Sequence, residues 1–478
     1  MHKNQSTQHI PTVFFDKKNN AWLEKEITSS MTKISNLSQL TFVSYNVWFE
    51  PHNFEERGVE LRKIMQESNA DFICLQEVTE PFFIKLLSSD WVREKYYVSK
   101  VKVSRYFTVI LSKIPCQFYY VDFITGMGRY LLYATFEVNG QSAAVATVHL
   151  ESLSNQEFRK DQLAVKFREL EPYPIAFIMG DFNLYGYSET RHFDPKYIDI
   201  WKFLKKDDPG YTMPRDEWFQ AWRPDKVLMK KNGKCKPVII ERMGTEPIPK
   251  YRNQQIDKDT SNKVSARQNC LQRCLDKLFS KKKGTVQSAP PESTVTNPVS
   301  NSKQSNQALE GASTVMTPSD HHGLFCKVEI LSSDQVEFPT EVPQKEAFLY
   351  FGSELFTEQN KSFLNAAAQK MEAKGIVFNA FEDVRDGLEY MVFRFEEWKS
   401  LTLITDMKGL ETIMKVGRLC LMNPIHRSRD DKNFGFNLIV TTRDEEKKAR
   451  TTLRLIGMDE KNYHVALSVV DILSGMGI

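Results

Sequence analysis

The stretch Ile175-Ala176-Phe177-Ile178-Met179-Gly180-Asp181-Phe182-Asn183-Leu184 is the strongest fold signal in this chain. An apolar run of this length that ends at a glycine predicts a buried strand. Asp181 and Asn183 follow where the strand emerges, and residues i and i+2 of an extended chain point to the same side. A carboxylate that can accept a proton is therefore placed beside an amide that can donate to an anion. Asp and Asn also favour turns, so this stretch alone leaves an ordinary turn as an equal alternative.

Length and composition limit what the chain can be. Its 478 residues exceed one typical domain, so we expect two or more. The formal net charge of +3 is close to neutral, so any surface that binds nucleic acid must be local. The seven cysteines are odd in number and scattered, which indicates reduced thiols. The start of the chain is polar, and no apolar run is long enough to cross a bilayer. We therefore expect a nuclear or cytoplasmic protein with no membrane contact.

Other predicted strands also end on polar residues. A strand at 40–49 carries Asn46 near its end, a buried strand at 71–78 ends at Glu77, and one at 142–150 ends at His149. Further strands are predicted at 107–112, 130–136, 223–229, 237–241 and 324–330, and helices at 55–68, 156–170 and 198–204. The chain therefore predicts a first domain in which strands and helices alternate.

Composition also suggests where the domains begin and end. Residues 1–38 have weak periodicity and predict a loosely attached N-terminal arm. Residues 39–331 predict the first domain, interrupted by a low-complexity insertion at 251–316 that predicts disorder. An acidic, Pro-containing linker at 332–346 leads to a predicted small α+β domain at 347–478. In that domain we expect helices at 358–373, 410–416 and 445–455, and strands at 376–378, 390–395, 401–404 and 435–440.

Seven polar residues close to predicted strands make up a candidate site: Asn46, Glu77, His149, Asp181, Asn183, Asp320 and His321. Strands that present polar ends at one edge of a sheet build a site there. The residue types suggest metal-assisted phosphoester hydrolysis. Glu77 is an oxygen ligand suited to Mg²⁺, and Asp181 can orient or deprotonate a water. His321, paired with Asp320, can donate to the phosphate.

Each of these residues also has a structural alternative. Glu77 could cap the following helix, Asp320 could be a helix cap or turn residue, and His149 could be a satisfied core histidine. The functional interpretation is favoured because the residues occur together.

Five motifs carry a family resemblance: Ser-Tyr-Asn-Val-Trp-Phe at 44–49, Leu-Gln-Glu-Val at 75–78, Val-His-Leu-Glu-Ser at 148–152, Gly-Asp-Phe-Asn at 180–183 and Pro-Ser-Asp-His at 318–321. In type and order they resemble the endonuclease/exonuclease/phosphatase superfamily, and within it the 5′-tyrosyl-DNA phosphodiesterases. The resemblance covers residues 40 to 331, less the insertion. It implies a deoxyribonuclease I-like fold, a four-layer α/β/β/α sandwich. It also implies a phosphodiesterase that depends on Mg²⁺, with Mn²⁺ as an alternative.

The resemblance implies a role for each candidate residue. Glu77 and Asn46 would hold the metal, Asp181 would activate the water, and His321 would stabilise the phosphate. Asn46, Asn183 and His149 would complete the catalytic set. Asp225, in Arg223-Pro224-Asp225, resembles the family's Arg-x-Asp strand and would support the site histidine. Glu151 and Ser152 would contact substrate.

The chain departs from the family pattern at two places. Many members carry Asp-Gly-Leu two residues after the first motif's Asn, where this chain has Trp48-Phe49-Glu50, and this difference concerns the metal site. The animal enzymes carry an Arg shortly after Asp-x-Asn, where this chain has Tyr185. We therefore expect Trp48 and Tyr185 to grip single-stranded DNA by stacking.

The sequence thus predicts hydrolysis of 5′-phosphotyrosyl bonds at single-stranded or frayed DNA ends, which would free them from trapped topoisomerase. Protein partners would bind through 251–316 or 347–478. Two alternatives stay open at this point. One is an RNA or nucleotide phosphodiesterase, or a phosphatase, on the same fold. The other is a non-catalytic binding module.

Overall fold

The computed structural model describes residues 6–102, 104–153, 155–184, 187–214, 221–249, 316–332, 336–338, 345–351, 361–374, 376–394, 398–416, 435–441, 449–450 and 463–466. The chain divides into two compact units, one made of Met1–Thr245 and Ser319–Ile478, the other of Glu246–Pro318. In the second unit, the backbone N–H of Ile248 donates to the Met316 carbonyl (2.8 Å). The predicted insertion at 251–316, apart from Met316, lies outside the described residues.

The stretch at 175–184 forms a central strand of an eight-stranded sheet with the order β1-β9-β10-β11-β12-β14-β13, in which β4 also pairs with β10. Its strands are β1 (Gln8–Ile10), β4 (Lys33–Ile34), β9 (Gln117–Asp122), β10 (Tyr130–Val138), β11 (Gln141–His149), β12 (Ile175–Asp181), β13 (Tyr197–Asp199) and β14 (Asp225–Lys230). Strand β12 runs parallel to β11 and antiparallel to β14, so both of its edges are paired and all seven residues are buried.

A second eight-stranded sheet has the order β15-β16-β5-β6-β8-β7-β2-β3. Its strands are β2 (Thr12–Asp16), β3 (Ala21–Lys25), β5 (Gln39–Asn46), β6 (Phe72–Val78), β7 (Tyr97–Ser99), β8 (Phe107–Ser112), β15 (Cys235–Met243) and β16 (Gly323–Ile330). Strand β16 pairs with both β15 and β5, which brings the chain after the insertion beside the first strand of the predicted domain.

The described part of the N-terminal region differs from the loosely attached arm expected at 1–38. Strand β1 pairs with β9, β2 pairs with β7, and β4 pairs with β10. Short strands gain hydrogen bonds from open sheet edges, and the partners of those bonds lie far along the chain. Periodicity within 1–38 therefore carries no signal of this pairing.

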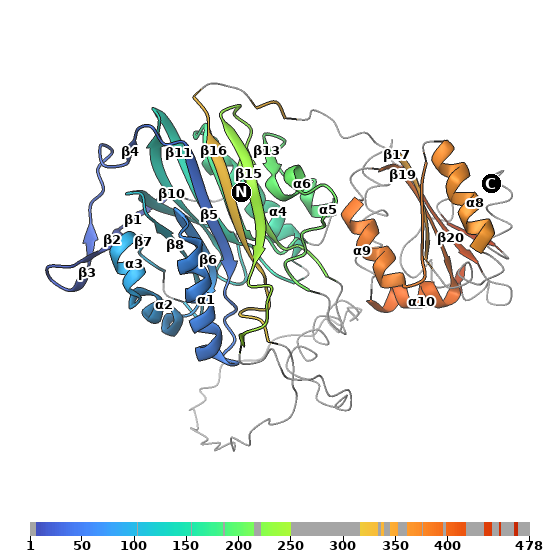
Figure 1. Cartoon of the computed structure of the whole chain (residues 1–478), viewed down its shortest axis with the longest axis horizontal. Helices are drawn as coiled ribbons and strands as arrows, with labels where there is room; N and C mark the ends of the chain where they lie inside the picture. The colour runs from blue at the N-terminus through green and yellow to red at the C-terminus, as the bar shows by residue number, and fades with distance from the viewer. Residues whose placement is uncertain are drawn as a thin grey trace, which may run out of the picture. The chain divides into compact units, whose positions relative to one another are not determined.

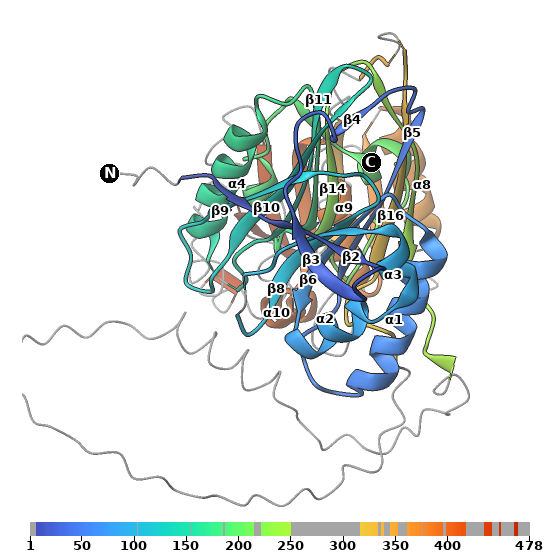
Figure 2. The ribbon, with the colours of Figure 1, turned by 90° about the vertical axis from the view of Figure 1, so that its left-hand side faces the viewer.

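Helices cover the outer faces of the two sheets, as Figures 1 and 2 show. Helices α1 (Phe54–Ser68), α2 (Glu80–Leu87) and α3 (Asp90–Lys95) pack on the second sheet, and α4 (Gln156–Leu170) packs on the first. Two short helices, α5 (Tyr187–Thr190) and α6 (Ile200–Leu204), follow β12. The inner faces share one core, in which the rings of Phe42 and Phe177 lie 4.6 Å apart. The layers are therefore helix, sheet, sheet, helix, in a mixed α+β fold.

A third sheet follows, with its own core, and has the order β18-β17-β19-β20-β21. Its elements are β17 (Lys345–Phe351), α8 (Lys361–Ala373), β18 (Val377–Phe381), α9 (Val384–Arg394), β19 (Trp398–Asp406), α10 (Met407–Val416), β20 (Gly435–Thr441) and β21 (Tyr463–Ala466). All its strands are parallel, so it is an α/β sheet with the strand order of a doubly wound fold, and the expected α+β class is corrected.

The strand predicted at 390–395 is wrong, because its described residues belong to α9. Val384, Leu388 and Met391 of α9 are buried at helical spacing, and this pattern extends back beyond the short run that suggested a strand. That residues 347–478 form a separate domain remains a prediction.

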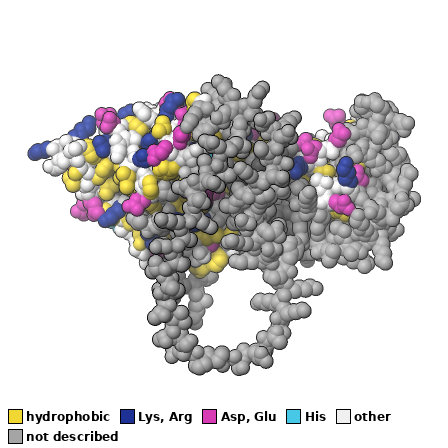
Figure 3. Space-filling view, turned by 90° about the horizontal axis from the view of Figure 1, so that it is seen from below, with side chains coloured by type: hydrophobic (Ala, Val, Ile, Leu, Met, Phe, Trp, Pro, Cys, Tyr) yellow, Lys and Arg dark blue, Asp and Glu magenta, His cyan; other side chains and the backbone are white. Residues whose placement is uncertain are grey.

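The state of the described cysteines agrees with the reduced thiols expected from the sequence. The four cysteines among the described residues, Cys74, Cys116, Cys235 and Cys326, are buried and free of disulfides. In the described part of the chain, no helix is both long and apolar enough to cross a membrane. Acidic and basic side chains are interspersed with hydrophobic ones on the coloured part of the face in Figure 3.

Candidate active site

Strand alternation brings two candidate residues from different sheets together. On β5, Asn46 shares a face with Phe42, and on β12, Asp181 shares a face with Phe177. Both phenylalanines lie in the core between the sheets, so both polar side chains lie at the end of that core. There Asn46 Nδ2 donates to Asp181 Oδ2 over 3.1 Å, and both residues are almost fully buried.

Glu77 reaches the same place through a backbone irregularity. Regular alternation along β6 would place Gln76 between the sheets and turn Glu77 away. However, the register with β8 shifts between Leu75 and Val78, and Glu77 has a φ of 56° in the left-handed region. Such irregularities re-aim a side chain and are common beside functional sites. The backbone N–H of Phe49 then donates to Glu77 Oε2 (3.1 Å).

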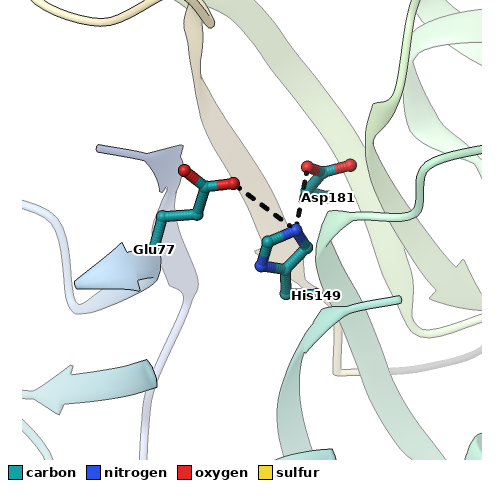
Figure 4. Close-up of side chains that lie close together, drawn as sticks. All are labelled: Glu77, His149 and Asp181. Atoms are coloured by element: carbon teal, nitrogen blue, oxygen red, sulfur yellow. Dashed lines mark ion pairs between the residues drawn. The ribbon is translucent and has the colours of Figure 1, made fainter. Parts of the chain in front are cut away.

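Glu77, His149 and Asp181 form a compact cluster, shown in Figure 4. His149 Nε2 lies 3.6 Å from Glu77 Oε1 and 3.5 Å from Asp181 Oδ2. One potential ligand atom from each residue lies within 4.8 Å of the others. The three residues come from β6, β11 and β12, which places both sheets at this cluster.

The protonation of His149 follows from its second neighbour, Arg129. Arg129 Nη1 lies 2.8 Å from His149 Nδ1. A guanidinium group can only donate, so Nδ1 must accept and the ring proton must lie on Nε2, facing the two carboxylates. Burial, together with the charge of Arg129, holds the pKa of His149 well below its ordinary value. The sequence analysis missed Arg129, whose only local signal is a charged residue directly before an apolar strand.

His321 lies against Asp225, the residue that the resemblance implied would support the site histidine, whereas the residue types had suggested the adjacent Asp320. Its Nδ1 lies 2.8 Å from Asp225 Oδ2, and the Thr212 hydroxyl donates to the same oxygen (2.5 Å). Burial opposes the charged form of His321, but the charges of Asp225, Asp320 and Asp181 raise its pKa well above the ordinary value. Its Nε2 lies 4.0 Å from Asp181 Oδ2, and the raised pKa favours the imidazolium form beside the cluster.

Ser319 connects this histidine to β5. Its hydroxyl donates to the Asn46 carbonyl (2.7 Å) and accepts from the backbone N–H of His321 (3.2 Å). The side chain is buried. Ser319 is a positioning residue that the sequence analysis quoted only as part of Pro-Ser-Asp-His.

Asp181 and Asn183 form a turn, and the turn orients the carboxylate. Asn183 has a φ of 51°, its backbone N–H donates to Asp181 Oδ1 (2.9 Å), and its side chain donates to the Leu150 carbonyl (3.1 Å). The turn interpretation and the site interpretation therefore both apply. Burial raises the pKa of Asp181, and the charge of Asp225 raises it further, against the opposing charge of His321.

The four residues expected to contact substrate do not share one environment. Glu151 is buried, and its carboxylate accepts from Gly126 N (2.9 Å) and Thr125 Oγ1 (2.5 Å), which braces that loop. The Ser152 hydroxyl lies 3.1 Å from Met127 Sδ. The Trp48 ring lies under the Arg57 guanidinium at 4.4 Å. Tyr185 lies outside the described residues.

The residues of the cluster fit a divalent cation. Burial, and next the charge of Asp320, raise the pKa of Glu77 to about 7, so the site disfavours its own negative charge. A cation would relieve this cost. Glu77 and Asp181 offer carboxylate oxygens, and Asn46 Oδ1 accepts one bond, from Trp48 N, which leaves one lone pair. Such oxygens suit Mg²⁺ or Mn²⁺. His149 Nε2 carries a proton and is not a ligand in this arrangement.

The chain belongs to the Endonuclease/Exonuclease/phosphatase family, whose model matches residues 43–321, more than half of the chain. This family is the one that the five motifs indicated.

Curated relatives carry a more specific name. The chain is similar to human tyrosyl-DNA phosphodiesterase 2, with 28% identity over 192 residues, which is 37% of this chain and 52% of the relative. It is 26% identical to the zebrafish (Danio rerio) protein of the same name over 229 residues, 43% of this chain and 60% of the relative. The chain thus spans about half the length of the human relative.

Solved structures with likeness to the chain include the zebrafish TDP2 complexed with single-strand DNA product. It has a TM-score of 0.43 and 20% identity, and the match covers 61% of this chain and 99% of that one.

Proposed function

We propose that this chain is a divalent-metal-dependent phosphodiesterase that hydrolyses 5′-phosphotyrosyl bonds between DNA ends and trapped topoisomerase. The cluster of Glu77, His149 and Asp181 is the observation that supports the chemistry. The names of the curated relatives support the substrate. On this proposal residues 39–331 form the catalytic domain, which acts in the nucleus or cytoplasm on single-stranded or frayed 5′ ends. Residues 251–316 or 347–478 bind protein partners.

In this proposal Glu77 and Asn46 hold the cation. When bound, a divalent cation polarises the phosphoryl oxygen and neutralises charge on the leaving group. Asp181 is oriented by Asn46 and Asn183 and takes a proton from the attacking water. Its raised pKa suits this task at neutral pH.

The two histidines act as donors to the phosphate. His321 is an imidazolium held by Asp225, and its Nε2 is available beside Asp181. His149 is neutral, and its Nε2–H is aimed by Arg129. Preorganised donors of this kind stabilise the charge that develops on the phosphoryl oxygens. Asn183 and Ser319 are positioning residues.

The test is hydrolysis of a single-stranded oligonucleotide with a 5′-tyrosyl group by the full chain with Mg²⁺. We expect release of tyrosine and a 5′-phosphorylated strand, and loss of this activity on chelation and in Asp181→Asn. Asp194→Asn, at a half-buried turn position before β13, is the matched control, because Asp194 Oδ1 also accepts from a backbone N–H two residues later. A wild-type protein that behaves like Asp181→Asn would exclude the proposed activity.

A substrate panel separates this activity from its rivals. RNA, mononucleotides and phosphomonoesters are offered beside the tyrosyl strand. Faster turnover of any of these would replace the proposed substrate while keeping the chemistry. Binding without turnover of every member, and without Mg²⁺-dependent stabilisation, would indicate a non-catalytic module.

A further inference from the structure

Aromatic side chains form a half-buried stack that begins at the cluster. Tyr106, just before β8, lies with its ring 5.9 Å from that of His149 at an interplanar angle of 33°. The ring of Phe49 stacks on Tyr106 at 4.7 Å and 23°. Both Phe49 and Tyr106 are half-buried, so each keeps part of its ring in contact with solvent. The proposed mechanism assigns no role to either ring.

Cations accompany the stack. The guanidinium of Arg105 lies 4.8 Å from the centre of the Phe49 ring, and that of Arg129 lies 5.2 Å from the centre of the Tyr106 ring. Arg105 is exposed, and in the described part of the chain no carboxylate forms an ion pair with it. An otherwise nearly neutral protein thus places two positive charges beside flat rings at the site. A ligand with aromatic rings and regularly spaced negative charges complements this arrangement.

Phe49 is also attached rigidly to the site. Its backbone N–H donates to Glu77 Oε2, so its position is tied to a candidate metal ligand. It belongs to Trp48-Phe49-Glu50, the segment where this chain departs from the pattern of many family members. The buried Arg57 holds that segment by donating to the carbonyls of Trp48 (3.1 Å) and Glu50 (2.6 Å). The ring is therefore presented by a braced backbone next to the phosphate site.

We infer that Phe49, stacked on Tyr106, is a platform for one base of a single-stranded nucleic acid whose 5′ phosphate lies at the cluster. This inference rests on the proposed function and names a further determinant of its substrate class. Base stacking on an aromatic ring is stronger than an exposed cation–π contact. The base therefore takes the ring face that Arg105 covers, and the released guanidinium pairs with a backbone phosphate. An internal base pair of a duplex cannot use the platform, because both of its faces are already stacked.

The experiment measures binding, so that it is independent of turnover. The full chain with Mg²⁺ is titrated with a 5′-phosphorylated hexathymidylate and with the same strand carrying an abasic site at position 1 or at position 2. Phe49→Leu removes the ring and keeps an apolar side chain, and Phe49→Trp keeps a ring. Phe14→Leu is the matched control, because Phe14 on β2 is also half-buried and has a cation, Lys25, 5.1 Å from its ring centre.

We expect Phe49→Leu to raise the Kd for the intact strand about tenfold, which corresponds to one base stack. The wild type should bind one of the two abasic strands with the same loss of affinity. Phe49→Leu should bind that abasic strand no more weakly than the wild type does, since both changes remove the same contact. Phe49→Trp and Phe14→Leu bind like the wild type. Arg105→Gln lowers the salt dependence of binding by about one ion.

The inference is overturned if Phe49→Leu binds the intact strand like the wild type, or if its loss adds to that of both abasic strands. It is also overturned if the loss is confined to strands that carry a 5′-tyrosyl group, because the ring would then hold the tyrosyl side. The protein could fail to hydrolyse the tyrosyl strand while the Phe49 and abasic changes remain non-additive in binding. That result would contradict the proposed function and leave this inference standing.

Discussion

Asp225 Oδ2 lies 2.8 Å from His321 Nδ1, although the two residues are 96 positions apart in the chain. Asp225 begins β14 in the first sheet, and His321 lies two residues before the start of β16 in the second. The hydrogen bond therefore joins the two sheets at the candidate site. Burial opposes the charged form of His321, but the charge of Asp225 and this hydrogen bond help to hold its pKa well above the ordinary value, which favours the imidazolium.

Asp225→Asn should reduce kcat about 100-fold, because an imidazolium that loses its carboxylate partner loses its proton more easily. The pKa of His321 falls, so the alkaline limb of the pH–rate profile should move to lower pH. The stability that His321 contributes is present below its ordinary pKa and is lost as pH rises through the raised value, so in the variant this contribution should be smaller and its loss complete at a lower pH. An unchanged alkaline limb would show that His321 does not act as the proton-bearing donor. Asp122→Asn, on the exposed side of β9, is the control.

Glu77→Gln should abolish the stabilisation of the protein by Mg²⁺ while leaving it folded. The pKa of Glu77 is raised to about 7, so its charged form costs stability as pH rises from about 4.5 to 7. Without metal, the variant should therefore be more stable than the wild type at pH 8. Because only the deprotonated carboxylate binds the cation, metal binding at pH 6 should release a proton. Thermal unfolding with and without Mg²⁺ measures the stability differences. Calorimetry of Mg²⁺ binding in two buffers of different ionisation enthalpy measures the proton release. Glu80→Gln, at an exposed position two residues after β6, should change neither.

Arg129→Met should lower kcat by about 10- to 100-fold, because His149 loses the donor that keeps its proton on Nε2. The burial cost remains, but the nearby positive charge is gone, so the pKa of His149 should rise toward its ordinary value. Nitrogen NMR shifts of His149 report the tautomer directly. If Nδ1 stays unprotonated in the variant, Arg129 does not set the tautomer. Arg93→Met is the matched control, since Arg93 also lies over an aromatic ring, that of Phe15 at 4.9 Å.

Lys166→Met should raise the free energy of unfolding by about 1–3 kcal/mol, because it removes a buried charge. Lys166 lies on α4 with its amine 3.7 Å from the centre of the Phe182 ring, and within the described residues this buried amine has no hydrogen-bond partner. Burial, and then the charge of Lys226, hold its pKa well below the ordinary value. The gain should be largest near neutral pH and should shrink as the pH rises toward the ordinary lysine pKa, above which wild-type Lys166 is neutral in both states. Chemical denaturation at pH 7 and pH 9.5 checks this. Lys63→Met, at an exposed position of α1, should show no such difference.

The sequence alone determined much of the first domain, because the relevant signals are local. The apolar run at 175–181 predicts β12, and helix α4 has the predicted bounds, 156–170. Alternation along β5 and β12 also places Asn46 and Asp181 on faces that point into the core. Side-chain period and apolar length are properties of neighbouring residues, so they can be read without a structure.

Only the tertiary structure decided the details on which the chemistry depends. The direction of Glu77 follows from a register shift against β8. The contact between His321 and Asp225, which family resemblance alone had suggested, forms between segments 96 positions apart. The proton position on His149 follows from Arg129, twenty residues earlier in the chain. Each of these is set by a contact between distant segments, and burial at the contact shifts the pKa. Local sequence carries no record of which distant groups meet, which is why spacing identified the candidate residues and the fold assigned their partners.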